Sequence, residues 1–406
     1  MTHDMRALTY DRARDPWDTT TGLRLQSVPQ PTWDPEHDHL DAPMVLIRPL
    51  LTGFCGSDRG IWHRRSFGEA LAASLDAEHR EVRVLGHELL GQIVAVGPEA
   101  VRLYGYRQGD IVSTESHIVD ETCYQCRVGD KHVCATAQII GISLDGCFSE
   151  LVKLPARSLW RTDLRRIRPE VAALQEPFGN AVHACTKVNL RGQSVAIIGL
   201  GTIGLFATAV AKSLGARQII GVEPVSRNRE MALALGADAV IAPSQTTAQS
   251  YIHDAAITEE LHALTDGIGV DVAIEMSGAT ASLNTAIAAA RRGGNVIMFG
   301  LKSGDAVIEH IDRVIVDGIS LHSVVGRRIW ETWYITRSLL ESPEPDIQGA
   351  IFDIILDKTR DCIIDVADFA SATFEHLVDT HPKVLLRWSD LESDEDVLPR
   401  TAESRL

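Results

Sequence analysis

The chain has 406 residues, which is more than one ordinary domain needs and enough for about two. Apolar residues make up 45% and charged residues 23%, a balance that suits a globular protein with two cores. The formal net charge is −16, from 55 acidic against 39 basic residues. Because such a charge repels phosphate backbones and anionic lipid, we expect no nucleic-acid partner and no membrane partner.

The N-terminal stretch and the cysteine pattern indicate a cytoplasmic protein. Residues 1–15 are polar and charged and contain no apolar signal core. The longest apolar stretch, residues 195–211, is interrupted by three glycines and is shorter than the ~20 residues that a membrane span needs. Of seven cysteines, three cluster between residues 123 and 134, and in a reducing compartment such a cluster more often binds metal than forms disulfides.

Residues 1–168 are predicted to form a β-rich first domain. Residues 43–50 and 91–97 are short β-branched runs bounded by Pro or Gly, as strands are. The segment between them, residues 59–83, is charged and Ala-rich. We expect it to be a surface helix or loop that contributes little to the core.

Residues 169–326 alternate between strand and helix patterns. Helices are predicted to begin at Thr202 and Glu230, and the predicted strands are residues 195–198, 217–223, 238–241, 270–275, 294–300 and 319–325. This alternation is typical of βαβ units and predicts an α/β fold with a doubly wound parallel sheet. Residues 327–406 are predicted to hold an aromatic helix at 330–340, short strands ending with 384–388, and an acidic, solvated tail from Ser389.

A glycine pattern inside the second segment indicates dinucleotide binding. Gly199, Gly201 and Gly204 follow a predicted strand, and Thr202 and Ile203 open the next helix. The first glycine allows a tight turn, the second lets the backbone approach a pyrophosphate, and the third lets helix and strand pack closely. The helix N-terminus then faces the phosphate charge, as in a Rossmann domain.

An acidic residue near the end of the next strand indicates which dinucleotide binds. Glu223 lies 19 residues after Gly204, where a carboxylate can hold ribose hydroxyls and repel the extra phosphate of NADP. Arg227 and Arg229 follow closely and could weaken that preference. The sequence therefore favours NAD over NADP.

Two short motifs in the first domain offer the donor atoms that zinc prefers. Cys55 and Ser57 lie in residues 53–58, and His87 and Glu88 lie in residues 85–91. Catalytic zinc takes nitrogen, sulfur or carboxylate ligands and keeps one position open for water or substrate. A lone Cys or His is usually a packed or surface residue, but these paired motifs upstream of a dinucleotide fold favour a catalytic metal site.

These residues resemble those of the zinc-containing medium-chain dehydrogenases, the alcohol dehydrogenase superfamily, over nearly the whole chain. Within that superfamily the resemblance extends to the L-threonine 3-dehydrogenase branch through residues 176–183, 275–279, 326–334 and 383–388. It implies a GroES-like catalytic domain at 1–168, to which 327–406 return, and a Rossmann domain at 169–326. It also implies hydride transfer from a secondary alcohol to NAD, and a homotetramer or a dimer.

The resemblance implies a role for each site residue. The catalytic zinc would be held by Cys55 and His87, with Glu88 and Glu176 close by and one or both on the metal. Ser57 would pass the alcohol proton onward. His117 matches a histidine that lies near the substrate, although a surface-loop histidine is the alternative interpretation.

The family's second, structural zinc site has four cysteines, and this chain departs from it. Cys123, Cys126 and Cys134 match the last three, whereas the first position is Asp120. A carboxylate can bind zinc, but closed zinc sites prefer thiolate. The alternative is a degenerate loop with three free thiols. The remaining cysteines, Cys147, Cys185 and Cys362, are expected to be buried small hydrophobes.

A second departure affects the substrate pocket. Threonine dehydrogenases carry a proton-relay histidine five residues after the zinc cysteine, where this chain has Gly60, with His63 three places later. The regions before Cys55 and between Cys55 and His87 also look longer than the family pattern. A polyol, sugar or cyclitol therefore stays open as the alternative to a threonine-like amino alcohol. Two further alternatives are a metal-free reductase, which would lack the cysteine and histidine ligands, and a non-catalytic protein on an inherited fold.

Overall fold

The computed structural model describes residues 4–243, 251–301 and 305–389, and its contacts divide the chain into two compact units. Unit 1 comprises residues 1–120, 136–176 and 361–406, and unit 2 comprises residues 121–135 and 177–360. The acidic tail that we predict from Ser389 falls, from residue 390 onward, outside the described residues. Each unit has its own sheet system and its own core, in keeping with the α/β class that the sequence predicts.

Unit 1 is built around a seven-stranded sheet in which β3 is the central strand. The order is β10-β6-β5-β3-β18-β17, and β9 also pairs with β3. The strands are β3 (Met44–Phe54), β5 (Glu88–Val96), β6 (Ile111–Thr114), β9 (Val152–Pro155), β10 (Leu159–Arg161), β17 (Ile363–Asp365) and β18 (Val384–Arg387). The chain thus returns to unit 1 at its C-terminal end to place β18 antiparallel beside β3.

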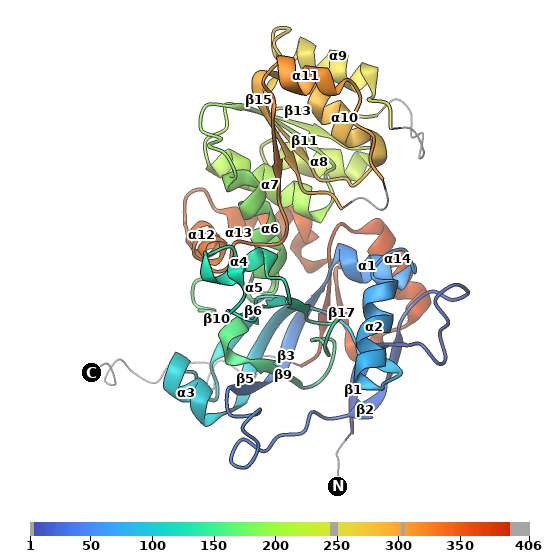
Figure 1. Ribbon diagram of the computed structural model, residues 1–406, viewed down its shortest axis with the longest axis vertical. Coiled ribbons are helices and arrows are strands. Elements are labelled where there is room, and N and C mark those ends of the chain that lie inside the picture. The colour runs from blue at the N-terminus through green and yellow to red at the C-terminus, as the bar shows by residue number, and fades with distance from the viewer. Residues whose placement is uncertain (1–3, 244–250, 302–304, 390–406) are drawn as a thin grey trace. The chain divides into compact units, whose positions relative to one another are not determined.

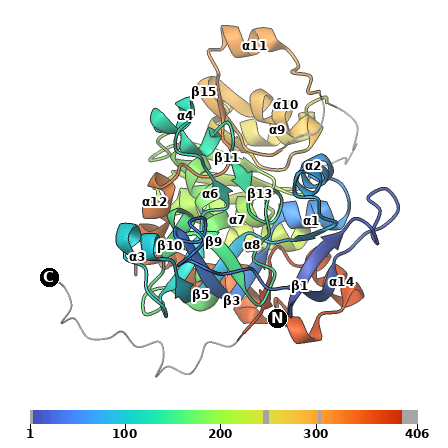
Figure 2. The ribbon, with the colours of Figure 1, turned by 60° about the horizontal axis from the view of Figure 1, so that its bottom comes forward.

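Two smaller sheets and several short helices complete unit 1. The small sheets are β2 (Arg24–Pro29), β1 (Asp4–Asp11) and β4 (Val82–Val84) in that order, and β7 (His117–Ile118) with β8 (Gln138–Ile139). The helices are α1 (Gly56–Trp62), α2 (Gly68–Glu78), α3 (Pro98–Tyr104), α5 (Pro169–Ala172) and α14 (Ser371–Thr380). Helices α1 and α2 lie side by side in both ribbon views (Figures 1 and 2).

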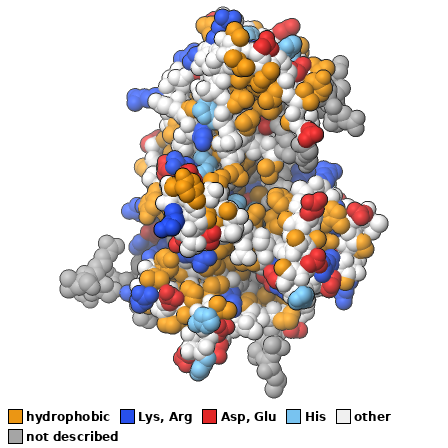
Figure 3. All heavy atoms as spheres, viewed as in Figure 1, with side chains coloured by type: hydrophobic (Ala, Val, Ile, Leu, Met, Phe, Trp, Pro, Cys, Tyr) orange, Lys and Arg blue, Asp and Glu red, His pale blue; other side chains and the backbone are white. Residues whose placement is uncertain are grey.

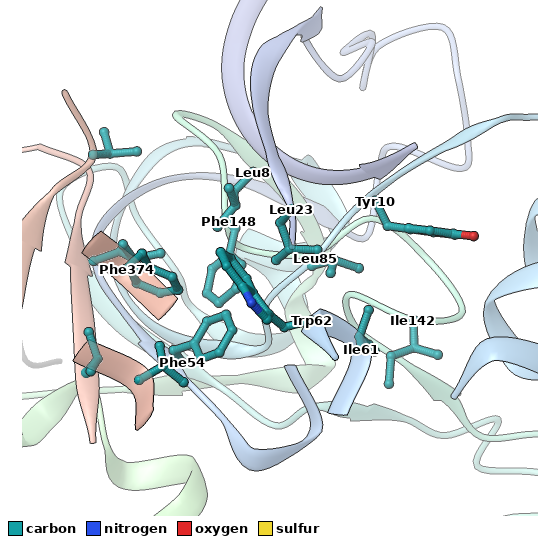
Figure 4. Close-up of a cluster of buried hydrophobic side chains, with 14 of the residues drawn as sticks. Leu8, Tyr10, Leu23, Phe54, Ile61, Trp62, Leu85, Ile142, Phe148 and Phe374 are labelled. Atoms are coloured by element: carbon teal, nitrogen blue, oxygen red, sulfur yellow. The ribbon is translucent and has the colours of Figure 1, made fainter. Parts of the chain in front are cut away.

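The segment between the two zinc-ligand motifs is part of the core, and our expectation of little core content for residues 59–83 is wrong. Ile61, Trp62, Leu71 and Leu75 are almost fully buried in one hydrophobic cluster. Figure 4 shows Trp62 at the centre of this cluster, among Phe54, Phe148 and Phe374. The apolar positions recur at helical spacing, but the surrounding charged and alanine residues hide that pattern in the sequence.

Unit 2 contains a six-stranded sheet in which every pairing is parallel. The order is β13-β12-β11-β14-β15-β16, so the strand order reverses between β11 and β14, as in a Rossmann fold. The strands are β11 (Ser194–Ile198), β12 (Gln218–Val222), β13 (Ala239–Ile241), β14 (Val270–Glu275), β15 (Ala290–Met298) and β16 (Ser320–Ser323). Each overlaps a strand that the sequence predicts.

Helices cover this sheet and extend the unit beyond it (Figure 1). They are α7 (Thr202–Ser213), α8 (Ser226–Ala234), α9 (Ala255–Ala263), α10 (Thr280–Ala289), α11 (Ile311–Val316), α12 (Glu331–Leu340) and α13 (Ile347–Ala350). The α6 helix (Gln175–Thr186) starts at the boundary between the units, and the short α4 (Tyr124–Arg127) belongs to the cysteine segment. None of the helices in the described ranges is both long and apolar enough to cross a membrane.

The contacts of residues 327–360 place this segment in unit 2, whereas the predicted domain boundary lies at residue 326. Arg327 is only 2% exposed, and its Nη1 donates to Asn180 Oδ1 of α6 at 2.9 Å. Helix α13 packs on α7. These contacts group the segment with unit 2, whereas we expect it from the family pattern to belong with the first domain.

Charged groups of both signs are distributed over the surface. On the face shown in Figure 3, Lys and Arg side chains are interspersed with Asp and Glu side chains. Many of them form exposed ion pairs, for example Arg6 with Glu150 and Arg161 with Asp110.

The aromatic cluster of unit 1 makes a testable prediction about stability. Trp62 is 1% exposed, and its ring centroid lies 5.3 Å from that of Phe374 and 6.1 Å from that of Phe54. Replacing Trp62 with Ala leaves a large cavity and should lower the free energy of unfolding by about 3–5 kcal/mol. Urea unfolding followed by circular dichroism measures the loss. The control Leu40→Ala, at a side chain that is 65% exposed, should change the free energy of unfolding by less than ~0.5 kcal/mol. Equal losses in the two variants would contradict the central place of Trp62 in the core.

Candidate active site and metal centres

Cys55, His87 and Glu88 form a cluster whose donor atoms all lie within 4.8 Å of one another. Cys55 directly follows β3 and precedes α1, while His87 and Glu88 lie at the start of β5. The antiparallel pairing of β3 and β5 sets Gly53 opposite Glu88 and so brings the two motifs together. Gly53 must lack a side chain, because a Cβ there would lie 1.8 Å from Glu88 Oε2.

The donor set fits a zinc ion. It offers one thiolate, one imidazole and one carboxylate, the three donor types of catalytic zinc sites. His87 and Glu88 are 5% and 0% exposed, whereas Cys55 is partly exposed. Three protein donors around a partly open position would leave room for one further ligand.

Asp58 orients two members of this cluster, a role that the sequence motifs by themselves do not predict. The backbone N–H of Cys55 donates to Asp58 Oδ2 at 2.9 Å, and Oδ1 lies 3.8 Å from His87 Nδ1. Asp58 is 1% exposed, and burial raises the pKa of its carboxyl although His87 opposes this. The three-residue spacing from Cys55 to Asp58 is that of a helix cap and its N3 partner, which is the signal in the sequence.

The surroundings of His87 are strongly acidic. Burial by itself lowers the pKa of this imidazole, but Asp58, Cys55 and Glu176 outweigh it and raise the pKa to about 10. Glu176 is the second residue of α6 and is 2% exposed. Because several buried groups that carry or can take negative charge surround one imidazole, the site favours a bound cation.

Lys383 is a second functional residue without an assigned role in the sequence analysis. Its Nζ donates to Glu88 Oε1 at 2.6 Å and to the carbonyl oxygen of Phe54 at 3.1 Å, and it also forms an ion pair with Glu88 Oε2. Lys383 and Glu88 are 2% and 0% exposed. The lysine therefore orients the Glu88 carboxylate and would share its oxygens with a bound metal ion.

Ser57 and His117 have different surroundings. Ser57 Oγ lies 3.5 Å from His87 Nε2, so the structure brings this hydroxyl to the cluster. His117 lies in the short strand β7, where its Nδ1 is 3.1 Å from Ser116 Oγ and 3.3 Å from Glu115 Oε1. The role of His117 beside a substrate therefore stays a prediction.

A second donor cluster consists of Asp120, Cys123, Cys126 and Cys134, again within 4.8 Å of one another. These residues lie on one continuous stretch of chain that includes α4. Cys123 Sγ is 3.8 Å from Cys134 Sγ, and Thr136 Oγ1 donates to Asp120 Oδ2 at 2.5 Å. The convergence of three thiols and one carboxylate fits a closed tetrahedral zinc site.

The other cysteines are packed in the interior, as the sequence predicts. Cys147, Cys185 and Cys362 are each 0% exposed and form no disulfide. Burial raises the pKa of the Cys185 thiol to about 12. Buried thiols of this kind behave as small apolar groups.

The glycine motif of unit 2 has the geometry of a dinucleotide loop. Gly199 has φ of +97°, and a Cβ there would lie 2.7 Å from the backbone nitrogen of Ser277. A Cβ on Gly204 would lie 2.0 Å from the Gly199 carbonyl oxygen, whereas a Cβ on Gly201 meets no atom of the described chain within 4 Å. Gly201 thus leaves open space for a phosphate, where α7 begins with Thr202 and Ile203.

Glu223 follows β12 directly and borders the same loop. Its Oε2 accepts the N–H of Leu200 at 2.8 Å, and its Oε1 accepts the N–H of Val225 at 3.0 Å. The two basic residues behind it each have a neighbour in unit 2. The Nη2 atom of Arg227 lies 4.0 Å from Oδ2 of Asp357. The Nη1 atom of Arg229 donates to the carbonyl oxygens of residues 223 and 224, at 2.7 Å each.

Comparisons with known proteins agree with this geometry. Residues 41–163 match the alcohol dehydrogenase GroES-like domain, and residues 202–342 match the zinc-binding dehydrogenase family. L-threonine 3-dehydrogenase of Pyrococcus horikoshii is 36% identical over 76% of this chain and 82% of its own length. The enzyme of the same name from Streptomyces avermitilis is 34% identical over 83% and 89%.

Solved structures share the fold. An alcohol dehydrogenase from Thermus sp. ATN1 superposes with a TM-score of 0.76 at 23% identity, covering 94% of this chain and 99% of that one. The 2R,3R-butanediol dehydrogenase of Bacillus subtilis gives a TM-score of 0.73 at 23% identity, with the same coverage. The chain therefore belongs to the zinc-dependent medium-chain dehydrogenases, in the region of that superfamily close to the L-threonine 3-dehydrogenases, and it is an alcohol dehydrogenase.

Proposed function

We propose that the chain oxidises a small secondary alcohol with NAD as hydride acceptor, at a catalytic zinc held by Cys55, His87 and Glu88, with Glu176 beside it. The observation that carries the proposal is the convergence of these three donor types within 4.8 Å, with the Ser57 hydroxyl 3.5 Å from His87. Zinc bound there would act as a Lewis acid that lowers the pKa of the alcohol.

The chain's own residues would orient the reaction and move the proton. Asp58 holds the backbone at Cys55 and faces His87, and Lys383 fixes the Glu88 carboxylate. The Ser57 hydroxyl would take the proton that leaves the alcohol oxygen. The acidic, buried surroundings favour a bound cation over an empty site, which supports an essential role for the metal.

Support for NAD comes from Glu223. Its carboxylate lies at the end of β12 beside the glycine loop, where it would accept hydrogen bonds from ribose hydroxyls and repel a 2′-phosphate. Arg229 is held on backbone carbonyls rather than aimed at a phosphate. NADP is therefore the less favoured cofactor.

The substrate class has two candidates. A threonine-like amino alcohol is favoured by the names of the similar proteins, which are L-threonine 3-dehydrogenases. A polyol, sugar or cyclitol is favoured by Gly60, which stands where we expect a relay histidine, and by the long segments that flank Cys55. We also propose a homo-oligomer, a tetramer or a dimer, and a cytoplasmic location.

Turnover on a substrate panel tests the proposed function. Zinc-replete protein should reduce NAD with at least one secondary alcohol from a set of β-hydroxy amino acids, including L-threonine, and of polyols and sugars. The value of kcat/KM should be more than tenfold higher with NAD than with NADP, because Glu223 repels the extra phosphate. Production of NADH, followed by its absorbance, is the measurement. If zinc-loaded, NAD-bound protein oxidises no secondary alcohol, the proposal fails.

Removal of the thiolate ligand tests the catalytic zinc. Cys55→Ser should lose one zinc per chain and at least 10³-fold in kcat, because the metal supplies most of the stabilisation of the alkoxide. NADH binding, measured by its fluorescence, should stay close to that of the wild type. Zinc content is measured by atomic emission. The buried Cys185→Ala serves as the control and should keep its zinc, and full activity of Cys55→Ser would refute the assignment.

The unusual ligand of the second cluster makes a separate prediction. Asp120→Cys should slow the loss of zinc to a chelator, and Asp120→Ala should speed it, because closed zinc sites prefer thiolate. We expect at least a tenfold difference in release rate between the two variants. A chromogenic zinc indicator follows the release. Equal rates in both variants would show that residue 120 is not a ligand.

A further inference from the structure

Gly60 lies in the middle of α1, and its missing side chain is replaced by that of Ser66. A Cβ built on Gly60 would lie 2.0 Å from Ser66 Oγ and 3.3 Å from Ser66 Cβ. The backbone supports this approach, because the N–H of Arg65 donates to the Gly60 carbonyl oxygen at 2.7 Å. A hydroxyl from the following loop therefore occupies the space that a side chain at residue 60 would fill.

The loop that delivers Ser66 is firmly held. Arg64 adopts φ of +56°, and its guanidinium donates to the carbonyl oxygens of Ile61 at 2.7 Å and Gly22 at 2.9 Å. The same guanidinium lies over the rings of Tyr10 and Trp17, at 4.9 Å and 5.5 Å from their centroids. These contacts offset the cost of the left-handed backbone and fix the position of the loop.

His63 ends α1 and is surrounded by acidic groups of α14. Its Nε2 lies 3.7 Å from Asp379 Oδ1 and its Nδ1 lies 3.9 Å from Glu375 Oε1, with the side chain 14% exposed. Arg59 donates to Asp379 Oδ1 at 2.6 Å and so takes part of its charge. The two ring nitrogens of His63 thus each face a carboxylate of α14.

His63 also borders a water-accessible cavity of about 530 Å³. The cavity is polar, and its walls come from residues 17–21 together with His63 and Arg64. A proton on the imidazole can therefore pass to bulk solvent, with Asp18 and Arg64 as the charged groups on the cavity side.

Ser57, Gly60 and His63 follow one another at three-residue intervals and so lie along one side of α1. All three are partly exposed, whereas Asp58 and Trp62 are buried on the other side. Neighbours at this spacing have Cβ atoms about 5–6 Å apart, a gap that a single water can bridge between hydroxyls. The Ser66 hydroxyl sits over the middle position, at Gly60.

We propose that Ser57, Ser66 and His63 form the proton exit of this enzyme and replace the histidine that the family pattern expects at residue 60. The inference rests on the proposed alcohol oxidation. As the alcohol O–H bond breaks, Ser57 Oγ accepts its proton and gives its own to a bridging water. The water passes a proton to Ser66, whose own proton moves to the His63 imidazole and then to solvent in the cavity. The hydride leaves the carbinol carbon for the nicotinamide, so the alcohol loses one proton and one hydride, and the hydride carries the two electrons.

Single-turnover formation of NADH tests this exit as a function of pH. His63→Gln should lower the rate about tenfold at pH 7 with KM changed less than twofold, because the relay lacks its terminal base. The difference should shrink towards pH 10, where hydroxide accepts the proton directly, and added imidazole should restore the rate at pH 7. His39→Gln, at a side chain 92% exposed, is the matched control and should behave as the wild type. Ser66→Ala should show the same pH dependence with a smaller loss.

The placement of Ser66 is tested without any turnover. Gly60→Ala should affect the melting temperature less favourably in the wild-type background than in the Ser66→Gly background, because the added methyl group meets the Ser66 side chain. In the background of His63→Gln, the pair Gly60→His/Ser66→Gly should regain activity at pH 7.

The outcomes separate the two proposals. A wild-type pH profile and rate in His63→Gln would overturn the relay and leave alcohol oxidation standing. Wild-type protein that oxidises no secondary alcohol would overturn the proposed function and the relay with it. An equal effect of Gly60→Ala on the melting temperature in the wild-type and Ser66→Gly backgrounds would overturn the placement of Ser66 whatever the activity.

Discussion

Three strands of unit 1 converge on one buried ion pair, and the geometry of the candidate metal site depends on it. Glu88 opens β5, Lys383 precedes β18, and the lysine also donates to the carbonyl oxygen of Phe54 at the end of β3. Lys383 comes from the far end of the sequence, so the site requires the C-terminal return of the chain. An unpaired buried charge costs several kcal/mol of folding free energy. Removing either Glu88 or Lys383 would therefore leave the other unpaired and destabilise the unit.

Further acidic groups lie buried beside this ion pair. Lys383 balances Glu88, but Asp58 and Glu176 are also buried, and the thiol of Cys55 and the ring of His87 lie among them. These acidic groups raise the pKa of His87, so that a protonated imidazole offsets part of their negative charge, and a bound divalent cation would also offset it. When the metal binds, His87 is neutral and can act as a ligand. The same acidic surroundings therefore favour a proton on His87 in the metal-free site and a cation in the metal-bound site.

The sequence predicts the parts of the molecule that have local signals. The alternation of strand and helix patterns is sufficient to predict the parallel sheet of unit 2, and the glycine spacing is sufficient to predict the loop at Gly199. Both patterns involve residues that are close together in the sequence. The two ligand motifs of the first cluster are also local. What the sequence does not reveal is pairing over long separations, such as Lys383 with Glu88, or the depth to which Trp62 is buried under a charged segment.

A related difficulty applies to Gly60, where the sequence shows only that a side chain is missing. Whether the space is empty, filled by water or taken by another residue depends on a loop whose path is fixed by Arg64, and Arg64 in turn depends on the rings of Tyr10 and Trp17. Those two residues lie in the long region before Cys55, which departs from the family pattern. The contacts of Arg64 thus connect Gly60 with the N-terminal region, because that region helps to position the loop whose Ser66 side chain takes the place of a side chain at residue 60. A missing side chain and a distant segment that look unrelated in the sequence can therefore belong to one structural rearrangement. Only the three-dimensional contacts connect them.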